Sequence, residues 1–273
     1  MNKGLTITLI VLLLTLVISL IVGLTIFIKK GISFTSFSIN NVSKNLVEEK
    51  EINNIKDLFI DFNTCDVEVK TTTEELIKVQ IYSDYEDSHK IEEQEDIINI
   101  VFREKKGSHF FKKTSKIYIY VPETYNKNIT IDGNVGDIHI PELVDSNIKA
   151  ELSVGDIHID NVNEADIKVS TGDIKIEKVT NLIAKLQTGD IKVEKVYNYI
   201  NIDARVGDVK IEEVELYEDS KIELKTGDVK IQRTNEIYID ADTRIGDTKV
   251  KNNDRKAEHE LTIKVDVGDI KVN

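Results

Sequence analysis

The dipeptide Gly-Asp, followed each time by a β-forming residue, recurs eight times between residues 135 and 271 of this 273-residue chain. Successive glycines are 17 to 22 residues apart, so the period is close to 19. Self-similarity at such a period indicates a stack of near-identical units rather than one globular enzyme core. The repeated glycines are Gly136, Gly155, Gly172, Gly189, Gly207, Gly227, Gly246 and Gly268.

Apolar residues alternate with polar ones on both sides of each repeated glycine. Around Gly155, Ala150 and Leu152 precede the glycine at alternate positions, and Ile157 and Ile159 follow it in the same way. Alternation of period two places one face of a strand inward and the other in water. Each unit therefore reads as strand, Gly-Asp corner, strand and looser corner, with two or three sides around a thin aliphatic core. The sequence predicts an all-β fold, a parallel β-solenoid of repeats of about 19 residues.

The corner residues have a mechanical explanation. A bend between two strands often needs a positive φ or a close backbone approach, which glycine provides without a Cβ clash. An aspartate beside it can accept a hydrogen bond from a nearby backbone N–H, as in an Asx turn. Two prolines, no tryptophan and abundant β-branched residues agree with extended structure.

The N-terminus predicts a membrane anchor. Residues 4–28 carry no charge, and 25 residues in a helix at about 1.5 Å per residue cross a hydrocarbon layer of about 30 Å. A cleaved signal peptide has a shorter apolar region and small residues at its cleavage site, whereas here bulky residues lead into Lys29 and Lys30. We expect one uncleaved transmembrane helix that contacts the lipid bilayer between Leu5 and Ile28. With Lys3 on the other side, basic residues nearly balance across the span, and they do not fix its orientation.

The remaining organisation follows from where the repeat template weakens. Cys65-Asp66 lies within a matching alternation but replaces the corner glycine by cysteine, so we interpret it as an early, degenerate rung. The last residues, 267–273, complete a strand, and an uncapped strand at the end of the stack is an edge that another chain can extend. The expected segments are 1–30 (tip and anchor), 31–57 (linker or stalk), 58–132 (degenerate rungs and cap) and 133–273 (regular repeats).

Several of these motifs together resemble a known family. They are the N-terminal apolar helix, the segment Thr-Cys-Asp-Val-Glu-Val at 64–69, the segment Lys-Ile-Tyr-Ile-Tyr-Val-Pro-Glu at 116–123, and the iterated Gly-Asp-Ile-x-Ile. Over residues 58–273 the chain is similar to the bacterial "putative adhesin" family of domains of unknown function. The resemblance implies a β-solenoid fold, frequent membrane anchoring, a location in the cell envelope and a link to envelope stress. It supplies no ligand, and Cys65 departs from its pattern.

The aspartates that follow the corner glycines are the first candidate site. If the repeats are in register, these aspartates form a column, and stacked carboxylates either repel one another or gather cations such as calcium. Lysines two residues further on can neutralise the column, so a structural corner is the favoured interpretation. The aspartates are Asp137, Asp156, Asp173, Asp190, Asp208, Asp228, Asp247 and Asp269, and the lysines are Lys175, Lys192, Lys210, Lys230, Lys249 and Lys271.

Histidine replaces that lysine in two consecutive units, at His139 and His158. Both should face outward, one rung apart. Two histidines without a nearby cysteine or third ligand make a poor zinc site. We therefore expect a solvent-facing pair that titrates near neutral pH and no metal site.

A basic segment with two aromatic residues is the last candidate site. It stands out because the net charge of the chain is −13, which disfavours nucleic acid as a partner. We expect a solvated hairpin tip, and the alternative is a contact with an anionic surface such as headgroups or a teichoic-type polymer. Its residues are Lys105, Lys106, Phe110, Phe111, Lys112 and Lys113.

No nucleophile elbow, zinc-protease motif or phosphate-binding glycine loop is present in the sequence, so we expect no enzyme and no cofactor. The favoured function is a non-enzymatic, single-pass membrane protein whose extracellular domain is an adhesin-like binding module for an envelope protein or surface polymer. The alternative is a scaffold that self-associates end to end through its terminal rung, as in the β-solenoids called bactofilins. Charged outward positions favour the module, since they promote solubility.

Overall fold

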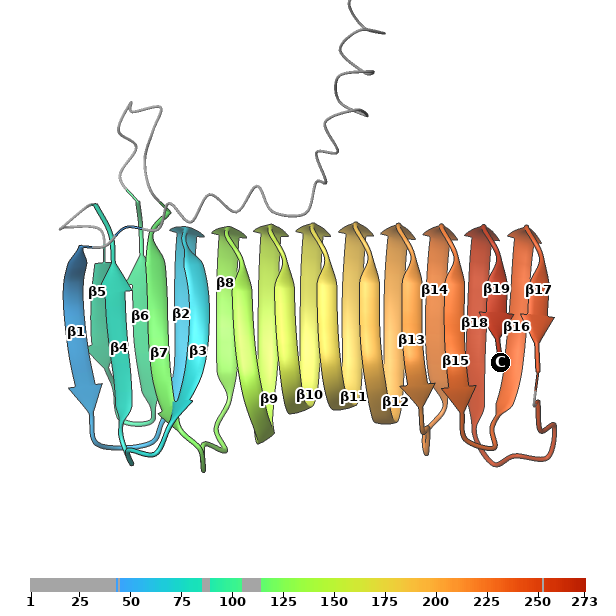
Figure 1. Ribbon diagram of the computed structural model, residues 1–273, viewed down its shortest axis with the longest axis horizontal. Coiled ribbons are helices and arrows are strands. Elements are labelled where there is room, and N and C mark those ends of the chain that lie inside the picture. The colour runs from blue at the N-terminus through green and yellow to red at the C-terminus, as the bar shows by residue number, and fades with distance from the viewer. Residues whose placement is uncertain (1–42, 44, 85–88, 105–113, 252) are drawn as a thin grey trace, which may run out of the picture. The chain divides into compact units, whose positions relative to one another are not determined.

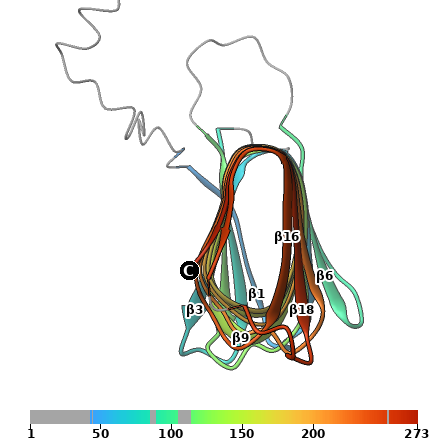
Figure 2. The same ribbon diagram turned by 90° about the vertical axis from the view of Figure 1, so that its right-hand side faces the viewer.

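The computed structural model describes residues 43, 45–84, 89–104, 114–251 and 253–273, and these residues form an all-β fold. Nineteen strands make one continuous sheet that stands as a row of rungs in Figure 1. Viewed along the row, each rung is a flattened coil with one tight bend, two long sides and a wider bend (Figure 2). The predicted β-solenoid is confirmed for this part of the chain.

The strands are β1 (Leu46–Ile52), β2 (Asp57–Thr64), β3 (Asp66–Thr72), β4 (Ile77–Tyr82), β5 (His89–Glu93), β6 (Ile97–Phe102), β7 (Lys116–Pro122), β8 (Ile129–Val135), β9 (Ile138–Val154), β10 (Ile157–Thr171), β11 (Ile174–Thr188), β12 (Ile191–Val206), β13 (Val209–Val214), β14 (Ser220–Thr226), β15 (Val229–Thr234), β16 (Tyr238–Ile245), β17 (Thr248–Val250), β18 (Glu260–Val267) and β19 (Ile270–Val272).

The central strands β9 to β12 are 15 to 17 residues long. Each begins after one Gly-Asp corner, follows one side of the coil, passes the wider bend and returns along the other side to the next corner. Neighbouring strands are parallel and in register, so that Ile157, Ile174 and Ile191 are direct partners. These three side chains are buried. Each rung therefore buries its inward face against copies of the same residues above and below, which makes the core a continuous aliphatic column.

The N-terminal end of the stack is closed by strands that are not part of the repeat. The rung formed by β2 and β3 lies between the β6–β7 rung and the β8–β9 rung. Beyond it, β4 pairs antiparallel with β7, β1 pairs with β4, and β5 pairs with β6. Lys50 Nζ on β1 donates to the carbonyl of Ile91 on β5 at 3.2 Å, so a hydrogen bond joins the two outermost strands at this end.

Residues 46–52 were expected within a linker, and this part of the expectation is wrong. They form β1, whose Ile52 is buried in the core. The alternation Val47, Glu48, Glu49, Lys50 is too charged to suggest a buried strand, and the burial comes from the position of β1 as a cap.

The order of the rungs at the C-terminal end also differs from the expected one. Strands β18 and β19, which end the chain, insert between the β14–β15 rung and the β16–β17 rung. In Figure 1 the C-terminus accordingly lies one rung inside the end of the row. The expectation that residues 267–273 form the terminal edge is therefore wrong, and the last rung is built from β16 and β17. In-register alternation is identical for both orders, so the repeat pattern does not distinguish them.

The expected transmembrane helix lies outside the described residues. Within the described part of the chain, no helix has the length and apolar character needed to cross a membrane.

Candidate functional site

The tight bend of each rung is built on a glycine with a positive φ. The eight corner glycines have φ between +132° and +147°. A Cβ built on Gly189 would lie 2.0 Å from the carbonyl oxygen of Gly172 in the preceding rung, and the other seven have an equivalent clash at 1.7 to 2.1 Å. Glycine therefore satisfies two requirements at once, a backbone conformation that other residues rarely adopt and a close approach between corners.

The aspartates after these glycines form a column of hydrogen bonds along the stack. Oδ1 of Asp173 accepts a hydrogen bond from the backbone N–H of Asp190 at 2.8 Å, and Asp190 accepts one from Asp208 at the same distance. The column begins at Asp66 and runs, at 2.8 to 3.0 Å, through all eight corner aspartates. The bond runs to the next rung instead of closing a local Asx turn. One carboxylate oxygen of each inner aspartate is thus already used by the fold, which supports the structural interpretation of the column.

Cys65 occupies the first corner. Its side chain is fully buried in the core, and Sγ donates to the carbonyl oxygen of Asp66 at 3.1 Å. Burial raises the pKa of this thiol well above its usual range, and the negative charge of Asp66 adds to the effect. Cys65 is therefore a core residue and a poor nucleophile.

A second column lies beside the aspartates on the outward face. His139, His158 and Lys175 are partners in register, and the column continues through lysines in each remaining rung. The lysines are, in stacking order, Lys175, Lys192, Lys210, Lys230, Lys271 and Lys249. We call this set of six the lysine column. An open groove of about 540 Å³ lies between the aspartates and the lysine column from Asp190 and Lys192 to the end of the stack.

The lysines do not neutralise the corner aspartates directly. Among the described residues, no salt bridge within 4.0 Å joins the two columns. Lys175 and Lys210 instead pair with the glutamates two residues further along their own strands, Glu177 at 3.5 Å and Glu212 at 3.8 Å. The corresponding residues beside Lys230, Lys271 and Lys249 are Gln232, Asn273 and Lys251, so the column becomes locally more positive in the last three rungs.

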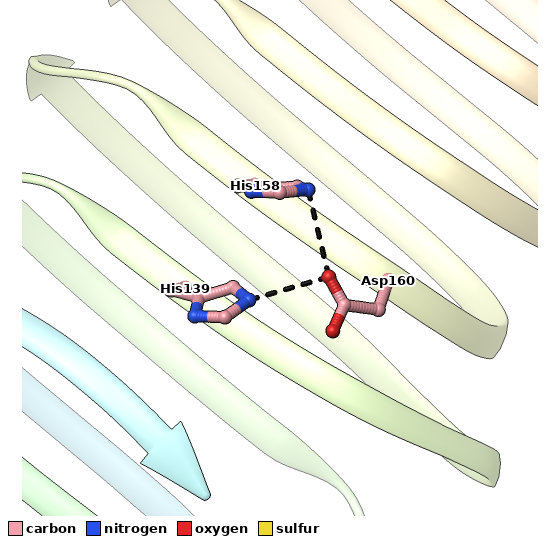
Figure 3. Close-up of side chains that lie close together, drawn as sticks. All are labelled: His139, His158 and Asp160. Atoms are coloured by element: carbon pink, nitrogen blue, oxygen red, sulfur yellow. Dashed lines mark hydrogen bonds and ion pairs between the residues drawn. The ribbon is translucent and has the colours of Figure 1, made fainter.

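The two histidines lie side by side at the other end of this column, where Figure 3 shows them converging on Asp160. Their rings are stacked with centroids 5.0 Å apart. Oδ1 of Asp160 lies 3.2 Å from Nε2 of His139 and 3.5 Å from Nε2 of His158. The sequence analysis missed this third polar group. The sequence could have predicted its position, because Asp160 lies two residues after His158 and the period-two alternation of a strand places both side chains on one face.

Lys175 completes the surroundings of His158. Its Nζ lies 3.2 Å from Nε2 of the imidazole, and Glu177 lies 3.7 Å from the same nitrogen. Burial lowers the pKa of His158, with further lowering by the charges of Lys175 and His139. His158 is therefore held in its neutral form at neutral pH.

The basic segment Lys105, Lys106, Phe110, Phe111, Lys112 and Lys113 lies outside the described residues, so its contact with an anionic surface stays a prediction. In the sequence it falls between β6 and β7.

Several solved structures are similar to this chain. A protein described as a putative adhesin from Bacteroides fragilis is 17% identical, with 84% of this chain and 97% of that chain covered and a TM-score of 0.52. A putative lipid binding protein from Parabacteroides distasonis is 15% identical over 84% of this chain and 99% of that chain, with a TM-score of 0.40. A putative adhesin from Parabacteroides merdae is 13% identical over 84% and 98%, with a TM-score of 0.38.

No curated protein is similar enough in sequence to count as a relative. The likeness to the Bacteroides fragilis protein shows a shared fold, and it agrees with the family expected from the motifs. The Toastrack DUF4097 family matches residues 55–273, which include every regular rung. The chain therefore belongs to the Toastrack DUF4097 family.

Proposed function

We propose that this chain is a non-enzymatic, membrane-anchored protein of the bacterial cell envelope whose solenoid binds an extended surface polymer. The observation that carries the proposal is the groove beside the lysine column. It repeats one set of charges at every rung, about 4.8 Å apart, and such a track suits a ligand that is itself extended and repetitive. The names of the structural neighbours, adhesins and a lipid binding protein, agree with a binding role.

The last three rungs are the proposed contact for negative charge. Lys230, Lys271 and Lys249 are exposed, and none has a glutamate two residues further along its strand. The corner aspartates line the same groove, but no salt bridge within 4.0 Å joins them to these three ammonium groups, so no ion pair has to be broken when an anionic ligand binds. We infer that a polymer with repeating phosphate or carboxylate groups binds to these three lysines. Its affinity for the solenoid should fall as salt is added.

The first test asks whether the solenoid lies on the outside of the cell. Protease added to intact cells should remove the solenoid, because we place it outside the membrane behind an anchor at residues 5–28. The same treatment of a cytoplasmic marker protein should leave that marker intact. Survival of the solenoid in intact cells and its loss only after lysis would contradict an extracellular domain.

Binding is tested with purified cell walls, before and after removal of their phosphate polymers. The variant Lys230→Gln/Lys249→Gln/Lys271→Gln should sediment with untreated walls much less than the wild type. The matched control, Lys149→Gln/Lys185→Gln/Lys221→Gln, removes the same charge from other strands and should sediment normally. Equal retention of both variants would contradict the groove as the binding site.

A further inference from the structure

Three donor atoms converge where the histidines replace the lysine column. His139 and His158 hold the same position in consecutive rungs, which sets their rings one strand spacing apart, and Asp160 lies beside them on the same outward face. One donor atom from each residue lies within 4.8 Å of the other two. The two measured distances to the carboxylate, 3.2 and 3.5 Å, are close to the edge of a zinc tetrahedron, roughly 3.3 to 3.5 Å for bonds of about 2.1 Å.

We propose that His139, His158 and Asp160 bind one divalent transition-metal ion, with Zn²⁺ as the best fit. Two imidazoles and one carboxylate are ligands that zinc, copper and nickel accept, whereas calcium and magnesium prefer oxygen alone. Three protein ligands leave the fourth position of a tetrahedral zinc for water or for a group of a bound partner. The site goes beyond the proposed function, because it does not depend on any ligand of the lysine column.

The contact with Lys175 indicates that Nε2 of His158 carries a lone pair. Lysine has only donor protons, so the contact between Lys175 Nζ and His158 Nε2 requires a lone pair on that nitrogen. A metal ion needs the same lone pair.

Lys175 also competes with the metal ion for Nε2 of His158. Its ammonium group occupies the lone pair of His158 and repels any cation that approaches. Glu177, 3.5 Å from Nζ, provides an alternative partner to which the lysine can turn. Replacement of Lys175 by glutamine should therefore strengthen binding, by about thirtyfold, because in water an ammonium about 4 Å away repels a divalent ion twice as strongly as a unit charge.

The site also joins two rungs, so metal binding should stabilise the fold. An ion that binds the folded chain and not the unfolded chain raises the midpoint of thermal unfolding. Because the three side chains are partly exposed, their replacement should leave the core intact.

The experiment is a Zn²⁺ titration of the full chain in mild detergent, against a chelating dye, with thermal unfolding as a second readout. We expect one Zn²⁺ per chain, removed by EDTA. His139→Ala, His158→Ala and Asp160→Asn should each weaken binding by at least about tenfold, since loss of an outer partner alone costs that much. Lys175→Gln should bind more tightly and show the larger rise in unfolding midpoint.

Two controls separate this site from adventitious binding. His259→Ala removes a histidine elsewhere in the solenoid, and Lys192→Gln removes the same charge one rung beyond Lys175, so both should bind as the wild type does. Wild-type affinity in His139→Ala and His158→Ala would overturn the proposal. Absence of bound Zn²⁺ from both the wild type and Lys175→Gln would also overturn it, because the ammonium group of Lys175 would then not be what prevents binding.

Discussion

The carbonyl oxygen of each corner glycine lies where the side chain of the next corner would begin. The positive φ and this close contact both require glycine at the same position. The neighbouring aspartate accepts a hydrogen bond from the following rung. Substitution therefore has two separable consequences at this scale. Loss of the glycine strains the backbone and separates two rungs, whereas loss of the aspartate removes one hydrogen bond from an exposed ridge.

Gly189→Ala should lower the free energy of unfolding by about 2 to 4 kcal/mol. Its Cβ would lie 2.0 Å from the oxygen of Gly172 at a φ of +136°, so strain and steric overlap add together. Urea unfolding of residues 42–273, which form one compact unit, measures the loss. Thr188→Ala, at the exposed neighbouring position, is the control. Equal urea midpoints for both variants would show that the corner tolerates a side chain.

Asp190→Asn should match or exceed the stability of the wild type, while Asp190→Ala should lose about 1 kcal/mol. Asparagine keeps the oxygen that accepts from Asp208 N–H and removes one charge from a column of like charges. Thermal unfolding with and without calcium distinguishes a structural column from a calcium-binding column. If the column were a calcium site, calcium would stabilise the wild type and not Asp190→Asn.

Adjacent strands are joined across the outward face by ion pairs at equivalent positions. Glu213 on β13 contacts Lys195 on β12 at 2.8 Å and Arg233 on β15 at 2.7 Å, so one carboxylate links three consecutive rungs. These hydrogen bonds lower the pKa of Glu213 from 4.5 to about 2. An ion pair that spans rungs stabilises the association of repeats, which is the step that a solenoid requires.

Glu213 should make stability depend on pH in a known direction. Its pKa is lower in the folded chain, so the ionised carboxylate stabilises the fold above about pH 4.5, and this stabilisation is lost as the pH falls toward 2. Glu213→Gln should lower stability at pH 7 and flatten the acid limb of the profile. Glu223→Gln, which pairs with Lys221 in its own strand, is the control. An unchanged acid limb in Glu213→Gln would contradict the linkage.

The insertion of β18 and β19 makes the last rung depend on the end of the chain. β16 pairs with β18, and no other strand of the described residues pairs with β16. Deletion of residues 260–273 should therefore leave the amides of β16 and β17 unprotected in hydrogen exchange. Protected β10 amides in the same variant would show that the remaining rungs are folded. Continued protection of 238–250 would mean that β16 docks directly on β14, as sequence order predicts.

The two ends of the solenoid are chemically different, which bears on whether the molecule polymerises. Antiparallel strands cover the N-terminal end, while at the C-terminal end no further strand of the described residues pairs with the outer edge of β16 and β17. The side chain of Asn253 bonds to the backbone of Ile239 there. Ile239 and Val250 keep the last rung apolar at two inward positions, but two other inward positions hold small or polar residues. Ala241 and Thr248 occupy the positions of Ile263 and Ile270 in the rung before. An end with less apolar surface than an inner rung gains less by stacking on another copy, which favours the binding module over the scaffold.

Ala241→Ile/Thr248→Ile should convert this end into an association surface. The two isoleucines extend the aliphatic core to an open edge, so sedimentation equilibrium should show concentration-dependent dimers or longer assemblies. Thr130→Ile/Thr262→Ile adds the same two side chains to outward faces of other rungs and should stay monomeric. Filaments formed by the unmodified residues 42–273 would instead support the scaffold.

Local periodicity determined much of this protein from its sequence. Alternation around Gly155 identified the strands and the inward face, and the Gly-Asp interval identified the coil, because both reflect contacts that recur at fixed spacing along the chain. The motifs at 64–69 and 116–123 identified the family. The anchor at residues 5–28, the extracellular location and the basic segment stay predictions.

Only the tertiary structure decided the rung order and the composition of the side-chain clusters. Any rung can stack on any other, since the inward residues are nearly the same, so the choice between β16 and β18 as neighbour of β14 depends on small differences such as Ala241 against Ile263. The same limit applies to Asp160. The sequence predicts that its side chain lies on the outward face. Its distance to two histidines on different rungs depends on the register between strands, which a single sequence does not encode locally.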